Sequence, residues 1–184
     1  MRWLLWLLGG ILLGGIVHLA TVLILPSTAT RDAYSRLSAL TPTNAFTTLD
    51  APSPDVSPLP FSDPAFTIAV CRYDLAQGPM RLTAPVTGAY TALTFYDRRG
   101  IAYYAINDRA AGRKIFELDL MTAEQHENLP QDEEITAADR LIVEAPQNEG
   151  LVMLRALAPE PSDRAIIREA VSKARCETQA PSLP

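Results

Sequence analysis

Residues 66–74 read FTIAVCRYD, and their pattern decides how the body of the chain is built. Bulky apolar residues alternate with smaller ones along this stretch, which is the two-residue period of a β-strand. Gln77-Gly78-Pro79 follows, and its glycine and proline interrupt regular structure. The sequence therefore predicts that a β-rich domain begins here with a strand over residues 66–74.

Six further segments carry strand patterns, and several are rich in β-branched and aromatic residues. They are residues 80–85, 90–96, 101–106, 114–120, 141–145 and 151–156. Residues 97–100 predict a hairpin between the second and third of these segments, because Gly100 can supply the positive φ angle of the turn. Residues 146–150 predict another hairpin between the last two segments.

Two short helices are expected beside these strands. Thr122 and Gln125 have the spacing of a capping box, which predicts a helix over residues 123–129. Ser162 is the expected N-cap of a C-terminal helix, with Asp163 in its first turn. The buried stripe predicted for that helix is Ile166, Ile167, Ala170, Val171 and Ala174.

Short strands joined by hairpins, without alternation of strands and helices, indicate a mainly β (α+β) fold. We expect an antiparallel β-sheet or sandwich domain with a few flanking helices, preceded by one transmembrane helix. A doubly wound nucleotide-binding fold is not expected from this order of elements.

The transmembrane helix is predicted from the run between Trp3 and Leu25, which contains no charged residue. At 1.5 Å per residue, such a run crosses a hydrocarbon core of about 30 Å. A cleaved secretory signal is the alternative, since Ser27-Thr28-Ala29 offers small residues for a signal peptidase. The apolar region of a signal is usually about 7 to 15 residues long, so the length favours an anchor. Gly10 and Gly14 form one GxxxG spacing, which either lets another helix pack closely or simply faces lipid.

We divide the chain into four parts: an anchor over 1–26, a juxtamembrane helix over 27–41, a proline-rich segment over 42–64, and a periplasmic β-rich domain with a C-terminal helix over 65–184. The proline-rich segment is not expected to hold regular structure. It is either a spacer or a wrap around the domain. The apolar side chains of the segment favour the wrap: Phe46, Leu49, Val56 and Phe61.

Charge and cysteine content restrict the surroundings of the domain. The chain has 16 Lys and Arg residues against 21 Asp and Glu, a net charge of −5 that disfavours nucleic acid and anionic lipid as ligands. Basic residues on both sides of the apolar run leave its orientation open by the positive-inside rule. Cys71 and Cys176 are compatible with one disulfide in an exported domain, or with two separate buried thiols in a reducing compartment. We favour a cytoplasmic N-terminus in the bacterial inner membrane with the domain in the periplasm.

The sequence resembles the small alphaproteobacterial membrane proteins of the domain of unknown function 1254 family over nearly its whole length. The segments that carry the resemblance are TRDAYSRLSAL, DPAFTIAVCRYDL, TFYDRRGIAYYAINDR, LDLMTAEQ, IVEAPQNEGLVMLRA and SKARC. The resemblance implies a membrane-tethered, mostly β periplasmic domain without an established activity. It also implies a sister protein of the domain of unknown function 1214 family, which longer relatives carry in the same chain.

The residues offer little support for catalysis, so we lean towards a protein that is not an enzyme and name no catalytic residue. His126 is the one histidine after the anchor and lies on a polar stretch, where a solvated side chain is expected. A dyad of His126 with Cys71 is disfavoured, because Cys71 lies in an apolar strand. Neither a metal site nor a cofactor is expected.

One polar cluster is a candidate ligand site, because carboxylate, guanidinium and phenol groups on adjoining strand ends can bind a small polar or anionic molecule. Its candidate ligand-binding residues are Arg72, Tyr73, Asp74, Tyr96, Tyr103, Asn107 and Arg109, with Asp97, Tyr104 and Asp108 beside them. The alternative interpretation is ordinary turns, surface ion pairs and half-buried tyrosines.

Three functions therefore remain open. The first is a membrane-anchored periplasmic binding or accessory module of unknown ligand, acting through a protein partner. The second is an accessory subunit of a larger inner-membrane complex, with the helix packed through Gly10 and Gly14. The third is a hydrolase-like enzyme completed by the sister domain.

Overall fold

The computed structural model describes residues 2–28, 32–53, 59, 62–112, 114–129 and 141–179. Three residues of the sequence predictions, Ala29, Val56 and Phe61, lie outside these ranges. The chain forms two compact units, Met1–Asp32 and Ala33–Pro184. The first contains helix α1 (Arg2–Thr28), which is long and apolar enough to cross a membrane.

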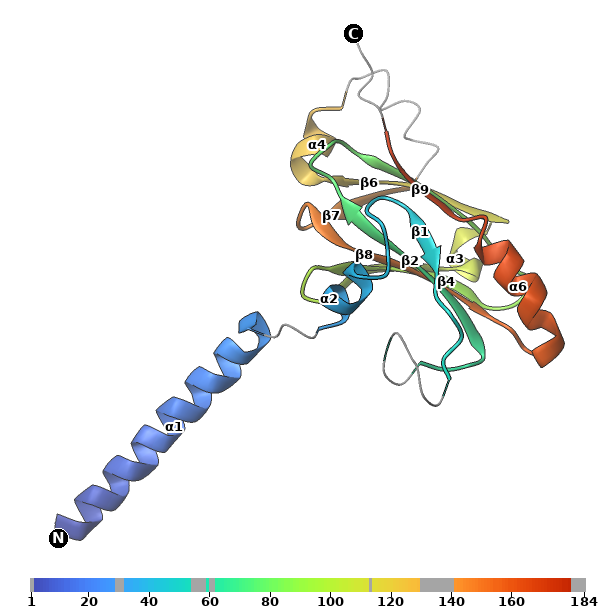
Figure 1. Cartoon of the computed structure of the whole chain (residues 1–184). Coiled ribbons are helices and arrows are strands. Elements are labelled where there is room, and N and C mark those ends of the chain that lie inside the picture. The colour runs from blue at the N-terminus through green and yellow to red at the C-terminus, as the bar shows by residue number, and fades with distance from the viewer. Residues whose placement is uncertain are drawn as a thin grey trace. The chain divides into compact units, whose positions relative to one another are not determined.

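The second unit is built from nine strands and five short helical segments among the described residues (Figure 1). Its strands are β1 (Phe46–Thr48), β2 (Phe66–Asp74), β3 (Met80–Pro85), β4 (Thr91–Asp97), β5 (Ala102–Asn107), β6 (Ile115–Thr122), β7 (Leu141–Ala145), β8 (Glu149–Leu157) and β9 (Arg175–Thr178). Its helices are α2 (Ala33–Ser38), α3 (Asp108–Ala111), α4 (Ala123–Glu127), the 3-10 turn η1 (Pro161–Asp163) and α6 (Arg164–Val171).

The strands form two sheets. The five-stranded sheet has the order β1-β2-β8-β4-β5, and all its pairs are antiparallel. The four-stranded sheet has the order β7-β6-β3-β9, in which β6 and β7 are parallel and the other pairs are antiparallel. The mainly β, α+β class is thus confirmed, and the smaller sheet is mixed.

The main core lies between the two sheets, where alternate side chains of both meet. The five-stranded sheet contributes Leu93, Phe95, Val152 and Leu154, and the four-stranded sheet contributes Leu82, Phe116, Leu118 and Leu120. Complete burial of each such side chain stabilises the fold by about 1.5–3 kcal/mol. A disulfide between Cys71 of β2 and Cys176 of β9 joins the sheets covalently.

The opposite face of the five-stranded sheet is also covered. Leu37 of α2 is fully buried, and Tyr34 and Leu49 pack with it against Val70 of β2 and Leu151 of β8. The segment after α1 therefore wraps the domain through Leu49, and the middle of strand β2 is buried on both of its faces. A strand covered on both faces is apolar at successive positions, as Ala69, Val70 and Cys71 are.

Several predicted elements agree with the structure. Strands β2 and β3 have the predicted limits, and Gly100 has φ +80° in the turn between β4 and β5. The capping box is formed as predicted, with the Thr122 side chain accepting from the Gln125 backbone and the Gln125 side chain accepting from the Thr122 backbone.

Other predictions were wrong. Residues 146–150 do not close a hairpin, because β7 and β8 belong to different sheets and the turn carries the chain from one sheet to the other. The proline-rich segment contains a short edge strand, β1, since proline-free residues 46–48 can pair with β2. Strand β9 was not predicted.

The C-terminal helix also differs from its prediction. Ser162 does not cap it, because Pro161–Asp163 form a 3-10 turn and the Ser162 hydroxyl donates to Glu160 instead. Ile166 is 69% exposed, whereas Ile167 and Val171 hold the helix on the core. Ala174 is buried beyond the end of the helix.

Loss of the disulfide is expected to destabilise the domain strongly. The bonded cysteines are 105 residues apart, and the chain-entropy model gives about 4–5 kcal/mol for a loop of this length. The double variant Cys71→Ala/Cys176→Ala should lose most of this free energy of unfolding, measured by urea unfolding of the full chain in mild detergent. A reductant should produce a similar loss in the wild type and none in the variant. An unchanged urea midpoint after reduction would contradict the expectation.

Candidate functional site

The predicted polar cluster is brought together only in part, around two tyrosines. The pairing of β4 with β5 shifts between Phe95 and Tyr96, so that Tyr103 is an extra residue opposite no partner. This β-bulge directs Tyr103 towards the core side, next to Tyr104. The hydroxyl oxygens of Tyr73 and Tyr103 are 3.1 Å apart, within hydrogen-bonding distance. The Tyr73 hydroxyl also lies 3.5 Å from the backbone carbonyl oxygen of Tyr96.

A glycine makes this arrangement possible. Gly150 pairs with Tyr73 across the β2–β8 ladder, and the tyrosine side chain passes over it towards β4. A Cβ atom at Gly150 would collide with the Tyr73 hydroxyl and the Tyr96 carbonyl oxygen. Burial raises the pKa of Tyr73 to about 12, and it raises the pKa of Tyr103 far above its ordinary value. Both phenols therefore stay protonated at neutral pH and act as hydrogen-bonding groups rather than as bases.

The remaining members of the predicted cluster have separate structural tasks. Asp74 accepts from the backbone nitrogen of Ala76, and Asn107 caps α3 by accepting from the backbone nitrogen of Ala110. Arg109 is exposed on α3, at the opposite end of β5 from the tyrosine pair. Asp97 is buried and accepts from the backbone nitrogens of two residues in its own hairpin.

Two further members also lie apart from the tyrosine pair. Arg72 donates to the Thr43 hydroxyl, on the segment that precedes β1. Asp108 accepts from the backbone nitrogen of Thr91, at the start of β4. The described geometry therefore brings Tyr73 and Tyr103 together with Asp97 near them. The Tyr96 side chain instead packs with the second core cluster, and the other charged groups of the predicted site lie elsewhere.

Replacing Gly150 by alanine should destabilise the domain. The new methyl group would overlap a side chain and a backbone carbonyl, so we expect a loss of about 1–3 kcal/mol in the free energy of unfolding. Gly88→Ala is the matched control, because a Cβ atom there meets nothing within 4 Å. Chemical denaturation of both variants measures the difference, and equal stabilities would show that the collision is relieved without cost.

The tyrosine pair also predicts a dependence of stability on alkaline pH. Well below pH 10 both tyrosines are protonated in the folded and unfolded chains. Their full contribution to the free energy of unfolding is then present. Between pH 10 and about 12 the unfolded tyrosines ionise first, and this favours the unfolded chain. The double variant Tyr73→Phe/Tyr103→Phe should lose less stability than the wild type between pH 9 and 11.5. Parallel pH profiles for the two proteins would refute this assignment.

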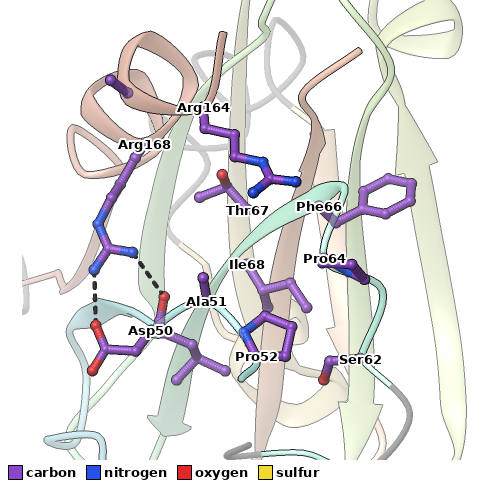
Figure 2. A pocket seen from close by; sticks show the side chains of 12 residues that line it. Asp50, Ala51, Pro52, Ser62, Pro64, Phe66, Thr67, Ile68, Arg164 and Arg168 are labelled. Atoms are coloured by element: carbon purple, nitrogen blue, oxygen red, sulfur yellow. Dashed lines mark hydrogen bonds and ion pairs between the residues drawn. The ribbon is translucent and has the colours of Figure 1, made fainter. Parts of the chain in front are cut away.

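A different part of the domain contains a pocket of about 250 Å³, between the start of β2 and helix α6 (Figure 2). Its walls come from three stretches: the segment after β1, the segment that leads into β2, and the first turns of α6. The lining residues are Leu49, Asp50, Ala51, Pro52, Ser62, Pro64, Phe66, Thr67, Ile68, Arg164, Ala165 and Arg168. Most of these side chains are apolar. Helix α6 contributes two arginines to the lining, and the other stretches contribute one carboxylate and two hydroxyl groups.

The pocket opens where the β1–β2 ladder stops. The last pair of that ladder is Thr48 with Ala69, so the beginning of β2 extends beyond the end of β1. Leu49 still donates its backbone N–H to the Ile68 carbonyl, and from there the chain turns away. The space beside Phe66 and Ile68 is left to the pocket.

Two arginines four residues apart on α6 border the pocket. Arg168 donates to the backbone carbonyl of Leu49 at 3.3 Å and to the carboxylate of Asp50 at 3.0 Å, and so ties the helix to the wrap. Arg164 extends across Thr67 towards Phe66 (Figure 2). Within the described part of the chain, the Arg164 guanidinium forms no hydrogen bond or ion pair. It is therefore available to a ligand.

A third guanidinium lies behind the pocket wall. Arg155 of β8 is stacked 4.6 Å from the centre of the Phe66 ring, a cation–π contact. Its buried Nε has no hydrogen-bond partner among the residues that the structure describes. This end of the five-stranded sheet is therefore locally basic, although the whole chain is acidic.

The sequence prediction missed this pocket. The spacing of Arg164 and Arg168 could have indicated two cations on one face of the helix. Nothing local shows that residues 49–52 and 62–68 face that helix, because the three stretches meet only through long-range packing.

The described residues contain no group of three or more His, Cys, Asp or Glu side chains suited to hold a metal. His126 lies with its Nδ1 2.7 Å from the Glu144 carboxylate on the surface, which agrees with the solvated position expected for it.

The fold and the pocket define a small two-sheet domain with an N-terminal apolar helix and one basic, mostly apolar cavity. The chain belongs to the family described as Protein of unknown function (DUF1254), whose model matches residues 43–178. The family thus covers the two sheets, the pocket and α6. No curated protein matches the chain.

The solved structures that resemble the domain include two bacterial proteins. The VPA0106 protein from Vibrio parahaemolyticus is 17% identical with a TM-score of 0.59, and the match covers 79% of this chain and 34% of that one. An uncharacterised protein from Burkholderia cenocepacia is 11% identical with a TM-score of 0.46, over 65% of this chain and 33% of that one. The first likeness shows the shared fold. The chain spans about a third of the length of either protein.

Proposed function

We propose that this protein is a membrane-anchored periplasmic binding module whose ligand occupies the pocket between β2 and α6, and which acts through a protein partner. The observation that carries the proposal is the pocket itself, where the Arg164 guanidinium, which has no partner within the described ranges, borders mostly apolar walls. Ligand pockets combine mostly apolar walls with a few polar groups that orient the ligand, and this one follows that pattern.

Two features support a membrane-anchored protein with its domain in the periplasm. The apolar helix has the length of an anchor, although a signal sequence has a similar character. The disulfide between Cys71 and Cys176 supports an oxidising compartment, because such bonds form and persist outside the cytoplasm. A cytoplasmic N-terminus in the inner membrane, with the domain in the periplasm, satisfies both features.

A protein partner is proposed from the size of the relatives. The match covers 34% of the Vibrio parahaemolyticus protein, so most of that protein lies outside the matched domain. The family resemblance suggests as the partner a sister protein of the domain of unknown function 1214 family, or another integral membrane protein. Hydrolysis that appears only after mixing with the sister protein would instead favour a shared enzyme.

An accessory subunit of a larger inner-membrane complex is the second candidate. A Cβ atom at Gly10 or Gly14 would meet nothing within 4 Å, so this face of α1 is open to another helix. Co-purification of integral membrane proteins that is lost in Gly10→Leu/Gly14→Leu would favour this role over a separate binding module.

The binding role is tested by native mass spectrometry of the full chain, tagged at its C-terminus and extracted from its own membranes in mild detergent. We expect a bound small molecule on the wild type. Ala165→Phe fills the pocket from its exposed rim and should abolish the added mass. Ala110→Phe, at an exposed alanine of α3 outside the pocket, should retain it. The proposal fails if the wild type carries no added mass, or if Ala165→Phe carries the same mass.

A further inference from the structure

We infer that the pocket between β2 and α6 binds a small monocarboxylate with an apolar body. This inference rests on the proposed binding function and specifies the class of its ligand. It depends on the charges at the rim, the shape of the guanidinium groups and the apolar floor.

The charges of the lining favour an anion. Arg164 and Arg168 are opposed by one carboxylate, that of Asp50, which leaves the lining with one net positive charge. Arg168 is already engaged with Asp50, whose side chain is 93% exposed. Arg164 has no such partner in the described parts of the chain and is the group that an anion can reach. An anion with one negative charge balances this lining.

The chemistry of arginine favours a carboxylate. A guanidinium presents parallel N–H donors whose spacing matches the two oxygens of a carboxylate. The Thr67 hydroxyl lies beside the Arg164 side chain in the pocket (Figure 2) and offers a further hydrogen bond to the same oxygen atoms. A doubly charged phosphate would lose more hydration on entering these apolar walls, and Asp50 would repel it.

The floor of the pocket favours an apolar body attached to the carboxylate. The apolar part of the lining consists mainly of Leu49, Pro52, Pro64, Phe66 and Ile68. The volume of about 250 Å³ lies below the range of about 300–1,000 Å³ for drug-sized ligands, so the ligand is small. A short acyl chain or a comparable hydrocarbon group fits this space better than a sugar or a nucleotide.

The test is calorimetric titration of the full chain in nanodiscs of zwitterionic lipid with acetate, butanoate and hexanoate. The affinity should rise by about fourfold for each added methylene until the pocket is full. Hexanamide, a neutral isostere, should bind at least tenfold more weakly than hexanoate.

Variants locate the binding. Arg164→Gln should weaken hexanoate binding about tenfold to hundredfold, because a charge-assisted hydrogen bond is lost. Arg164→Lys should bind hexanoate with an affinity between those of the wild type and Arg164→Gln. A lysine keeps the positive charge but lacks the parallel N–H donors of the guanidinium. Lys114→Gln removes a positive charge from an exposed residue outside the pocket and should leave the affinity unchanged.

Each other result overturns the inference in a recognisable way. If hexanamide binds as well as hexanoate and Ala165→Phe blocks both, the carboxylate class is wrong and the binding function stands. Tighter binding of inorganic phosphate, or of a short peptide with a free C-terminal carboxylate, would replace the small monocarboxylate by that class. Hexanoate binding that persists in Arg164→Gln would place the anion elsewhere. If no probe binds and native extracts carry no added mass, the proposed function fails as well.

Discussion

Residues 69–71, in the middle of strand β2, are buried on both faces of the sheet and paired along both edges, and the rest of the domain is arranged by that constraint. The strand pairs with β1 and β8, and its Cys71 joins β9 of the other sheet. Its outward-facing Val70 is covered by α2 and the wrap, while its inward-facing Ala69 lies in the main core. Residues 33–42, which precede the part matched by the family, are therefore part of the folded unit, because without α2 an apolar face of the five-stranded sheet would meet water.

The two ends of β2 have different surroundings. At its C-terminal end, Tyr73 crosses Gly150 and meets Tyr103 at the bulge of β5, where protonated phenols link three strands. At its N-terminal end, β1 stops short and the space beside Phe66 and Ile68 remains open. The first end is closely packed, with hydrogen-bonding contacts between its side chains. The second end borders an open pocket, in which Arg164 has no partner among the residues that the structure describes. This difference favours a candidate site at the start of the strand.

Much of this fold could be predicted from local pattern. The alternation in residues 66–74 and 80–85 defined two strands with their observed limits, and the capping box at Thr122 was formed as expected. Turn chemistry alone did not show that residues 146–148 join two sheets rather than two neighbouring strands. Strand β9, with the sequence RCET, is too short and polar to be recognised without its pairing to β3.

The candidate site was harder to predict for a similar reason. The sequence indicated a cluster of polar residues at neighbouring strand ends, but Asn107 caps helix α3 and Asp97 accepts hydrogen bonds within its own hairpin. The pocket instead combines residues 49–52, 62–68 and 164–168, which long-range packing brings together. A site made of ordinary apolar residues with two arginines carries no local motif.

The most direct measurement is methyl NMR of the full chain in nanodiscs during titration with hexanoate. The account predicts chemical-shift changes at Leu49 and Ile68, which line the pocket, and none at Ile106, which packs near α3 at the far side of the five-stranded sheet. Changes confined to methyl groups outside the pocket, or no change at any methyl group, would contradict a ligand site at the start of β2.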